Sequence, residues 1–353
     1  MPASHLNFKA AVLVETGKPL RILDDIKAPA LQRGQVLVKL KFAGLCHSQL
    51  MEAKGARGKN NYLPHFLGHE GSGIVVSTGD GVTKVKVADE VVVGWIKGDG
   101  LEGGAKVYES ASFGKINAGA VTTFSQFTVV SENRVYLKPS TTPFDLAVLY
   151  GCALPTGTGL VINEMRPREN ASIAVIGVGG IGLSALLALR QFNPKHLIAI
   201  DSEDHKLSLA KELGATAVLN ASDTDIKKKI FIKIGSEGFD YAVEAAGKTS
   251  TIEFGFEIIK RNGGQLIFAS HPAAGEKIKI DPFELICGKS IRGSWGGASK
   301  PDTDITLLGQ MYEAGQLPLE SLLSHQYRLE DLNKAMSALE NKSIVRALIN
   351  LWD

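Results

Sequence analysis

Cys46, His69 and Cys152 are the residues of this sequence best suited to hold a metal ion. Two thiolates and an imidazole are ligands that zinc selects, and three protein ligands leave the fourth tetrahedral position open for a substrate. Such an open site is typical of catalytic zinc. Taken singly, each residue has a simpler explanation, because a cysteine is often a small buried hydrophobic residue and a histidine often lies in a turn. Spacing alone does not decide between the two explanations.

A cluster of glycines predicts a second site, for a nucleotide. The segment Gly177-Val178-Gly179-Gly180-Ile181-Gly182 fits G-x-G-x-x-G and lies between a predicted strand and a predicted helix, and Asp201 ends the next predicted strand. Such glycines let backbone amides and a helix N-terminus approach a pyrophosphate, and an acidic residue at that place accepts hydrogen bonds from the adenosine ribose. A 2′-phosphate would meet the Asp201 carboxylate, so the sequence favours NAD over NADP. The alternative is that these glycines serve only close packing of helix on sheet.

Two different patterns predict the elements that position these residues. Up to about residue 139, short alternating runs separated by turn residues predict strands. These strands are 10–14, 35–42, 73–77, 90–93 and 128–130. From residue 171, apolar strands alternate with helical patterns, which is typical of βαβ units on a parallel sheet. These strands are 173–176, 197–201, 217–220, 241–245 and 265–269, with helices at 181–191 and 204–213. Helices near 305–314 and 329–340 and a last strand at 346–351 follow.

The composition excludes several classes of function. The 353 residues are 44% hydrophobic and carry a net charge of +2, which provides no basic field for nucleic acid. Three cysteines are too few for a disulfide framework, so we expect a reducing compartment. The N-terminus shows no secretory pattern, which favours a cytoplasmic protein. The uncharged run 171–189 is long enough to span a membrane, but its glycines fit a strand, a turn and a helix instead.

The motifs together resemble those of the medium-chain zinc-dependent alcohol dehydrogenases. The stretch 68–73, with Gly79 and Val82 behind it, resembles the zinc signature of that family. Further matches are 44–48, 123–127, 151–159, the glycine motif and 342–346, so the resemblance covers nearly the whole chain. The reaction that it implies is hydride transfer between an alcohol and NAD, in either direction.

The resemblance also implies a role for each site residue. Cys46, His69 and Cys152 would hold one catalytic zinc ion, with Glu70 behind them or as an alternate ligand, and Ser48 would take the proton of the substrate. The remaining residues would bind the dinucleotide: Thr156 and Ile181 beside the nicotinamide, His47 and Arg346 at the pyrophosphate, and Lys206 with Asp201 at the ribose.

The fold implied by the resemblance is α/β, with two domains. A doubly wound parallel (Rossmann) nucleotide domain at 154–296 would be inserted into a β-rich GroES-like catalytic domain formed by 1–153 and 297–353, with the site between them. Relatives pair through the edges of their nucleotide sheets, here the strand around 291–294, so we expect a homodimer or a homotetramer.

The sequence departs from the family at three places near the site. The segment 97–120 has none of the four cysteines that hold a structural zinc ion in many relatives. We therefore expect a loop or a shortened lobe there, and no structural zinc. Met51 replaces the histidine that usually ends the proton relay, so the proton must leave by another route. Gln49 replaces an acidic residue, so the surroundings of His69 are expected to differ.

Several polar residues fall where the family's pocket is usually apolar. His271 and Ser294 take the places of aliphatic residues, and Trp95 and Lys97 follow a strand that normally supplies an aromatic wall. The hypothesis is a polar, sugar-like alcohol or carbonyl substrate held by His271 or Lys97. It is equally consistent with the sequence that His271 lies in a loop and that Lys97 is solvated.

Other functions compete with a general alcohol dehydrogenase. A polyol dehydrogenase generally replaces the third ligand by glutamate, and a glutathione-linked formaldehyde dehydrogenase generally keeps the four-cysteine lobe. A zinc-independent quinone or enoyl reductase would lack the ligands and prefer NADPH. From a different class, a non-catalytic dinucleotide-binding protein would have no need of the set Cys46, His69, Cys152 and Ser48.

Overall fold

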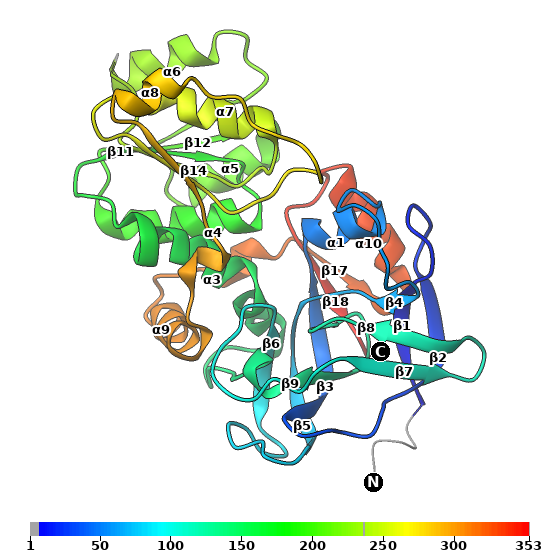
Figure 1. The fold of residues 1–353 in the computed structure, drawn as a ribbon. Helices are drawn as coiled ribbons and strands as arrows, with labels where there is room; N and C mark the ends of the chain where they lie inside the picture. The colour runs from blue at the N-terminus through cyan, green and yellow to red at the C-terminus, as the bar shows by residue number, and fades with distance from the viewer. Residues whose placement is uncertain (1–6, 236, 353) are drawn as a thin grey trace. The chain divides into compact units, whose positions relative to one another are not determined.

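The computed structural model describes residues 7–235 and 237–352, which fold into two compact units (Figure 1). One unit contains the chain up to Cys152 together with the segment from Lys300 onward, and the other is Ala153–Ser299. The first unit is rich in strands, and the second alternates strands and helices. The predicted α/β fold class is confirmed.

The first unit contains a closed barrel and a seven-stranded sheet. The barrel has the strand order β1 (Asn7–Leu13), β2 (Arg21–Lys27), β7 (Lys106–Ser110), β8 (Gly114–Ala118) and β4 (His65–Phe66). The sheet has the order β10 (Val135–Leu137), β6 (Glu90–Gly94), β5 (Glu70–Thr78), β3 (Gln35–Leu45), β18 (Ala347–Asn350) and β17 (His325–Arg328), with β9 (Phe127–Ser131) also paired to β3. The helices of this unit are α1 (His47–Ala53), α2 (Phe144–Ala147), α9 (Pro301–Glu313) and α10 (Leu332–Glu340).

The central strand β3 illustrates why these segments form a sheet. Val36, Val38 and Leu40 lie two residues apart and all join one apolar core, as the period of a strand requires. Residues of β18 enter the same core, so the C-terminal segment folds back onto the sheet that the N-terminal half begins. Four of the five strands predicted in this half lie within observed strands, and the fifth, 10–14, extends one residue beyond the end of β1 at Leu13.

The segment 97–120, for which the sequence suggested a loop or a shortened lobe, is not a plain loop, because it contains the antiparallel hairpin β7 and β8. In β7, Lys106, Tyr108 and Ser110 are buried, whereas Val107 is 42% exposed. The alternation is therefore that of a strand, but with a lysine inside and a valine outside. This inversion hid the period of two from an analysis based on hydrophobicity.

The second unit is a six-stranded parallel sheet with helices on both faces (Figure 1). Its strand order is β13 (Ala217–Asn220), β12 (His196–Asp201), β11 (Ser172–Ile176), β14 (Tyr241–Glu244), β15 (Gln265–Phe268) and β16 (Ser290–Gly293). Its helices are α3 (Ala153–Gly159), α4 (Gly180–Leu189), α5 (Asp204–Glu212), α6 (Ile226–Ile234), α7 (Thr249–Ile258) and α8 (Pro282–Ile286). The order reverses between β11 and β14, which is the switch point of a doubly wound fold.

The apolar run that resembled a membrane span is β11 followed by α4, as the sequence predicted. Helix α4 is buried from Gly182 to Leu189, which explains why its sequence is apolar on all sides. In the described part of the chain no single helix has the length and apolarity of a membrane span, and one bent pair, 144–151 with 153–165, meets both criteria together.

A buried carboxylate fixes the segment that leads into β7. Glu132 is 1% exposed and accepts hydrogen bonds from the backbone N–H groups of Thr83 (2.6 Å), Lys84 (2.7 Å) and Leu101 (2.8 Å). Burial opposes ionisation, but the three N–H donors and the charge of Lys84 outweigh it and hold the pKa of Glu132 below its ordinary value. This carboxylate joins the segment around Leu101 to the turn before β6.

We expect Glu132→Gln to destabilise this unit by about 2 kcal/mol at pH 7, because the new amide group would face the N–H donor of Leu101. The pKa of Glu132 is lower in the folded state, so its contribution is fully present above the ordinary value of 4.5 and is lost as the pH falls through the folded pKa. Urea unfolding at pH 7 and in acid tests this, with Glu109→Gln on the exposed face of β7 as the control. Equal losses of stability at both pH values would contradict the assignment.

Candidate functional site

Strand pairing brings the first two predicted ligands together. Cys46 follows the end of β3 and precedes α1, and His69 stands just before β5. The strands β3 and β5 are antiparallel and place Ala43 opposite Gly71, so the end of one strand meets the start of the other. Gly68 has a φ of +93°, and a Cβ atom there would lie 2.4 Å from the hydroxyl oxygen of Thr123, so this position requires glycine.

Close packing of glycines brings the third ligand to the same place. Gly151 ends a short 3₁₀ helix, and Cys152 follows it. A Cβ atom on Gly151 would lie 2.8 Å from Cβ of Glu70 and 2.6 Å from the carbonyl oxygen of Val93. The turn before Cys152 therefore packs directly against β5 and β6.

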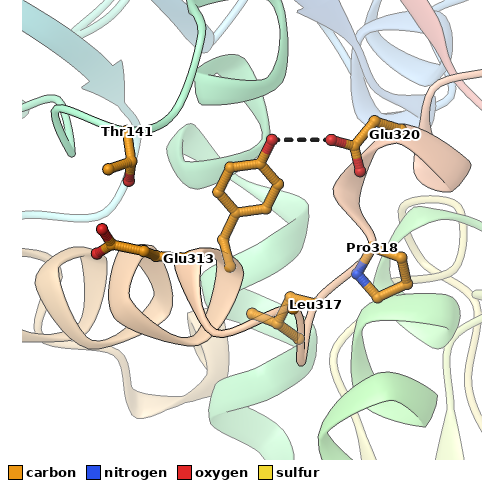
Figure 2. Close-up of a pocket in the computed structure, with 7 residues that line it drawn as sticks. Thr141, Glu313, Leu317, Pro318 and Glu320 are labelled. Carbon is orange, nitrogen blue, oxygen red and sulfur yellow. Dashed lines mark hydrogen bonds between the residues drawn. The ribbon is translucent and has the colours of Figure 1, made fainter.

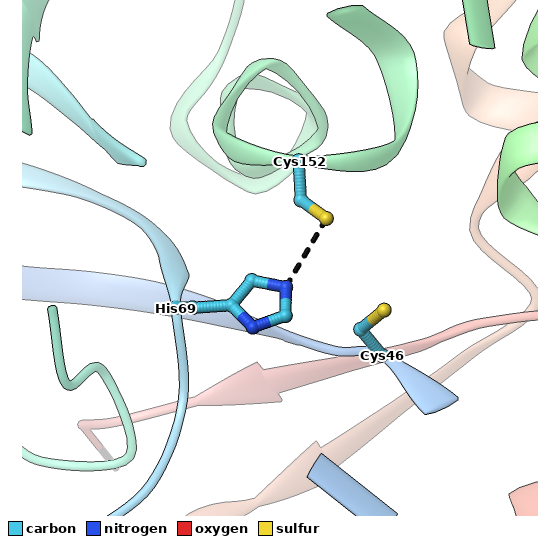
Figure 3. Close-up of side chains that lie close together, drawn as sticks. All are labelled: Cys46, His69 and Cys152. Carbon is cyan, nitrogen blue, oxygen red and sulfur yellow. Dashed lines mark hydrogen bonds between the residues drawn. The ribbon is translucent and has the colours of Figure 1, made fainter. Parts of the chain in front are cut away.

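The three side chains form one cluster (Figure 3), and all their ligand atoms lie within 4.8 Å of one another. The distance from Nε2 of His69 to Sγ of Cys152 is 3.1 Å. A tetrahedral zinc ion with ordinary bond lengths requires about 3.6 Å between nitrogen and sulfur ligands and about 3.8 Å between two sulfur ligands. The donor set and spacing fit zinc after a shift of a few tenths of an ångström. This is the one such group among the residues that the structure describes.

The two thiols of the cluster have opposite pKa shifts. A hydrogen bond from Cys152, together with His69 and the charge of Arg346, lowers the pKa of Cys46 well below its usual value. The hydrogen bond to Cys46 and burial raise the pKa of Cys152. A bound cation would favour the thiolate form of both groups.

Behind the ligands lies a buried ion pair between Glu70 and Arg346. The guanidinium group of Arg346 contacts both carboxylate oxygens of Glu70, and the two side chains are 4% and 0% exposed. Burial raises the pKa of Glu70, and the charge of Arg346 works against that rise. Gly44 leaves room for the carboxylate, since a Cβ atom there would lie 2.6 Å from Cδ of Glu70. The structure thus places Arg346 against Glu70, and its Nε has no partner among the described residues.

Gln49, which replaces an acidic residue of the family, lies beside His69. Its Oε1 accepts a hydrogen bond from the backbone N–H of Cys46 at 2.9 Å, and its amide nitrogen contacts Nδ1 of His69. The side chain is 3% exposed. One neutral residue therefore links two of the ligands and caps α1.

Ser48 lies in the first turn of α1 with its hydroxyl group buried and without a hydrogen-bond partner among the described residues. A buried hydroxyl normally has a partner, so an orphaned one indicates a group that is absent from the structure. His47, its neighbour, is exposed. Ser48 therefore fits the predicted role of a group that meets the substrate.

In the second unit, the glycine motif forms the turn between β11 and α4. Gly177 has a φ of +83°, and a Cβ atom on Gly182 would lie 1.9 Å from the carbonyl oxygen of Gly177, so both glycines are required by the fold. A Cβ atom on Gly179 would meet nothing within 4 Å. The space left there, at the N-terminus of α4, fits the pyrophosphate of a dinucleotide.

Asp201 ends β12 beside this turn. Its carboxylate accepts hydrogen bonds from the backbone N–H groups of Val178 (2.9 Å) and Glu203 (3.1 Å), which fixes its position. Lys206 is half-buried in α5, and Ile181 is half-buried in the first turn of α4. The hydroxyl of Thr156 in α3 is buried and has no partner among the described residues, as expected of a group that contacts an absent ligand.

One residue near this turn was missed by the sequence analysis. Glu244 ends β14, is fully buried, and accepts hydrogen bonds from Ala246 N–H (2.9 Å), Gly247 N–H (2.8 Å) and the Thr251 hydroxyl (2.7 Å). Burial raises its pKa, and its second oxygen has no partner among the described residues. Glu244 could have been identified from its position at the carboxyl end of a central strand, because such folds bind ligands there.

The predicted pocket residues are each held by local contacts. The Ser294 hydroxyl donates to Glu164 and accepts from the backbone N–H of Gly297 at 3.0 Å. Lys97 forms an ion pair of 2.8 Å with Glu102 and is 59% exposed. His271 is exposed, with Nδ1 at 3.0 Å from the carbonyl oxygen of Pro272, and Trp95 is half-buried. Their role in substrate binding stays a prediction.

A hollow of about 510 Å³ lies elsewhere in the first unit (Figure 2). It is lined by Thr141 and by residues of the segment 312–320. The hydroxyl of Tyr312 donates a hydrogen bond of 2.8 Å to Glu320 there. None of the predicted site residues lines it.

Comparison with known proteins finds alcohol dehydrogenase relatives for both parts of the chain. Residues 32–140 match the family model of the alcohol dehydrogenase GroES-like domain, and residues 180–312 match that of the zinc-binding dehydrogenases. The S-(hydroxymethyl)glutathione dehydrogenase of Synechocystis is 30% identical over 97% of this chain and 99% of its own length. The class-3 alcohol dehydrogenase of Cereibacter sphaeroides is 29% identical over the same shares.

Solved structures agree with the fold. An alcohol dehydrogenase zinc-binding domain protein from Burkholderia ambifaria superposes with a TM-score of 0.90 at 28% identity and covers 99% of this chain and 100% of its own. The benzyl alcohol dehydrogenase of Acinetobacter calcoaceticus gives a TM-score of 0.88 at 27% identity and covers 98% and 100%.

Proposed function

The chain belongs to the medium-chain zinc-dependent alcohol dehydrogenases, which makes it an NAD-linked oxidoreductase of alcohols, and we propose that Cys46, His69 and Cys152 hold its one catalytic zinc ion. The observation that carries the proposal is the convergence of two sulfur atoms and one imidazole nitrogen within 4.8 Å. Three ligands leave a fourth position for the oxygen of an alcohol. A structural zinc of the four-cysteine type is not expected, because the chain has three cysteines in all.

Bound zinc would supply a Lewis acid that lowers the pKa of an alcohol, and bound NAD would supply the acceptor of its hydride. The residues of the chain prepare and complete this chemistry. The thiolates of Cys46 and Cys152 neutralise the charge of the metal ion, Gln49 orients His69, and the hydroxyl of Ser48 accepts the proton that the alcohol loses. Glu70 and Arg346 form the charged wall behind the ligands.

The second unit is proposed to bind NAD through the turn at Gly179 and the carboxylate of Asp201. The other predicted contacts, from His47, Thr156, Ile181, Lys206 and Arg346, belong to the same proposal. A hydrogen bond donated by a ribose hydroxyl to the charged carboxylate of Asp201 would contribute about 1.5–3 kcal/mol, and the same carboxylate would repel a 2′-phosphate.

We therefore expect Asp201→Ala to weaken NADH binding about tenfold to a hundredfold and to strengthen NADPH binding. Quenching of protein fluorescence by each cofactor measures both constants. Asp225→Asn, an exposed residue before α6 that pairs with Lys229, is the control and should change neither. An unchanged ratio of the two constants in the Asp201 variant would remove Asp201 from the cofactor site.

The substrate proposal is an alcohol of low molecular weight, with S-(hydroxymethyl)glutathione as the second candidate because relatives of that name align over nearly the whole chain. A polar, sugar-like alcohol held by His271 or Lys97 stays a prediction, as does a cytoplasmic location. The test is NADH formation by the zinc-loaded protein with primary, aromatic, polyol and sugar alcohols and with formaldehyde plus glutathione. No NADH from any of these would favour a non-catalytic dinucleotide-binding protein.

We propose a homodimer that joins two copies at β16, the edge strand of the parallel sheet. Phe283 and Ile286 in the neighbouring α8 are 57% and 79% exposed, which is unusual for large apolar residues on a free surface. Sedimentation of the full chain tests this. Ile286→Glu should dissociate the dimer, whereas Ile232→Glu on α6, where the isoleucine is 73% exposed, should not. A wild-type monomer would contradict the proposal, and a homotetramer would extend it.

A further inference from the structure

Ser48 needs a route by which the proton it receives can reach water. The histidine that ends the relay in relatives is Met51 here, and methionine does not accept protons at neutral pH. The route must therefore use other residues near α1. The inference below rests on the role proposed for Ser48.

Glu52 is a candidate acceptor one helical turn after Ser48. It stands four residues after Ser48 in α1, so the two side chains lie on the same face with Cβ atoms about 6 Å apart. One water molecule between the Ser48 hydroxyl and the Glu52 carboxylate would bridge the two groups. The side chain of Glu52 is 27% exposed, so it reaches solvent as well as the helix face that carries Ser48.

The carboxylate of Glu52 contacts a buried imidazole. Its Oε1 lies 3.3 Å from Nε2 of His65 in β4, and the His65 side chain is 8% exposed. Among the described residues, the other charged group that contacts Glu52 is Arg57, whose guanidinium lies 3.6 Å from the second carboxylate oxygen. Glu52 in α1, Arg57 just after it and His65 in β4 thus form one cluster of charged and titratable side chains.

His65 has partners for both of its protonation states. Nδ1 lies 2.7 Å from the carbonyl oxygen of Phe66, which accepts a hydrogen bond from the Nδ1–H group in either state. In the neutral imidazole, Nε2 accepts a hydrogen bond from the amide of Asn60 at 2.8 Å. In the protonated imidazole, Nε2 becomes a donor and the Glu52 carboxylate accepts it. Protonation of Nε2 would therefore exchange the hydrogen bond from Asn60 for a charge-assisted one to Glu52.

We propose that Glu52 and His65 form the proton exit of this enzyme in place of the missing relay histidine. The O–H bond of the alcohol breaks and its proton moves to Ser48, whose own proton passes through one water molecule to the Glu52 carboxylate. Glu52 then releases the proton to Nε2 of His65 or directly to water. No electrons are transferred in these steps.

The experiment follows proton release without turnover. Zinc-loaded enzyme with NAD is mixed with trifluoroethanol, an acidic and poorly oxidised alcohol, and a pH-indicator dye records the proton in stopped flow. Glu52→Gln should slow the release at least tenfold, less than the roughly hundredfold at which general-base effects usually begin, because water partly substitutes. Glu340→Gln is the matched control, since Glu340 pairs with Lys54 just after α1 and lies outside the relay.

Two further results identify the role of the cluster. Imidazole added to Glu52→Gln should restore fast release, and so should the second substitution Met51→His, whereas a purely structural role predicts neither rescue. His65→Asn should slow release less than Glu52→Gln, because Glu52 still reaches water. Zinc content and NAD affinity should be unchanged in all variants.

Release at the wild-type rate in Glu52→Gln would overturn the proposal. Slow release that neither imidazole nor Met51→His restores would also overturn it, because the substitution would then have acted on structure. If wild-type protein binds zinc and NAD but releases no proton, the role of Ser48 fails together with the relay. Failure to bind zinc would instead overturn the proposed zinc site.

Discussion

Replacement of Cys46 or Cys152 by serine is expected to abolish zinc binding and to lower kcat/KM for alcohol oxidation by at least about a thousandfold. Each thiolate is one of three ligand atoms within 4.8 Å, and a serine hydroxyl is a poor ligand for zinc. Loss of the metal ion removes several kcal/mol of transition-state stabilisation, and about 4 kcal/mol corresponds to a thousandfold.

The third cysteine provides the matched control for this prediction. Cys287 follows α8 in the nucleotide unit and is not among the clustered ligands. Cys287→Ser should keep full zinc content and activity. The measurements are elemental analysis and steady-state kinetics on the same preparations. A Cys46→Ser protein with full zinc and wild-type kinetics would exclude the cluster as the catalytic metal site.

Ser48→Ala is expected to lower kcat about a hundredfold, within the usual range of general acid–base effects, while zinc content and NAD affinity stay the same. Because the Ser48 hydroxyl has no partner among the described residues, its removal breaks no hydrogen bond and should not lower the thermal midpoint.

Ser48→Thr separates the hydroxyl from the shape of the side chain, since it keeps the hydroxyl and should retain most of the activity. Steady-state kinetics and thermal unfolding of the two variants provide the test. If alanine and threonine reduced kcat equally, proton transfer through this hydroxyl would be ruled out.

The catalytic cluster and the nucleotide turn were predictable because both depend on residue types at fixed places along the chain. The spacing of Gly177 and Gly182 predicts a turn between a strand and a helix, and Asp201 is predicted to end the next strand. The structure has the turn between β11 and α4 and places Asp201 at the end of β12. Cys46 and His69 became credible through their match to a family, and the pairing of β3 with β5 explains why they meet.

What escaped prediction depends on contacts between distant residues. The hairpin of β7 and β8 was missed because buried Lys106 and exposed Val107 invert the usual pattern of a strand. His65 was missed because its contact with Glu52 joins strand β4 to helix α1, and no sequence motif predicts that contact. The ion pair of Lys97 with Glu102 likewise has no sequence signal. It engages the ammonium group of Lys97, a residue that the sequence analysis assigned to the substrate pocket.

The central claim is that this chain holds one zinc ion at Cys46, His69 and Cys152. Elemental analysis of the purified protein, expressed per chain and without added metal, tests it most directly. We expect one zinc ion per chain, consistent with a single group of suitable ligands among the described residues. Two zinc ions per chain would require a second site. A purified protein without zinc would contradict the assignment of this cluster as a catalytic metal centre.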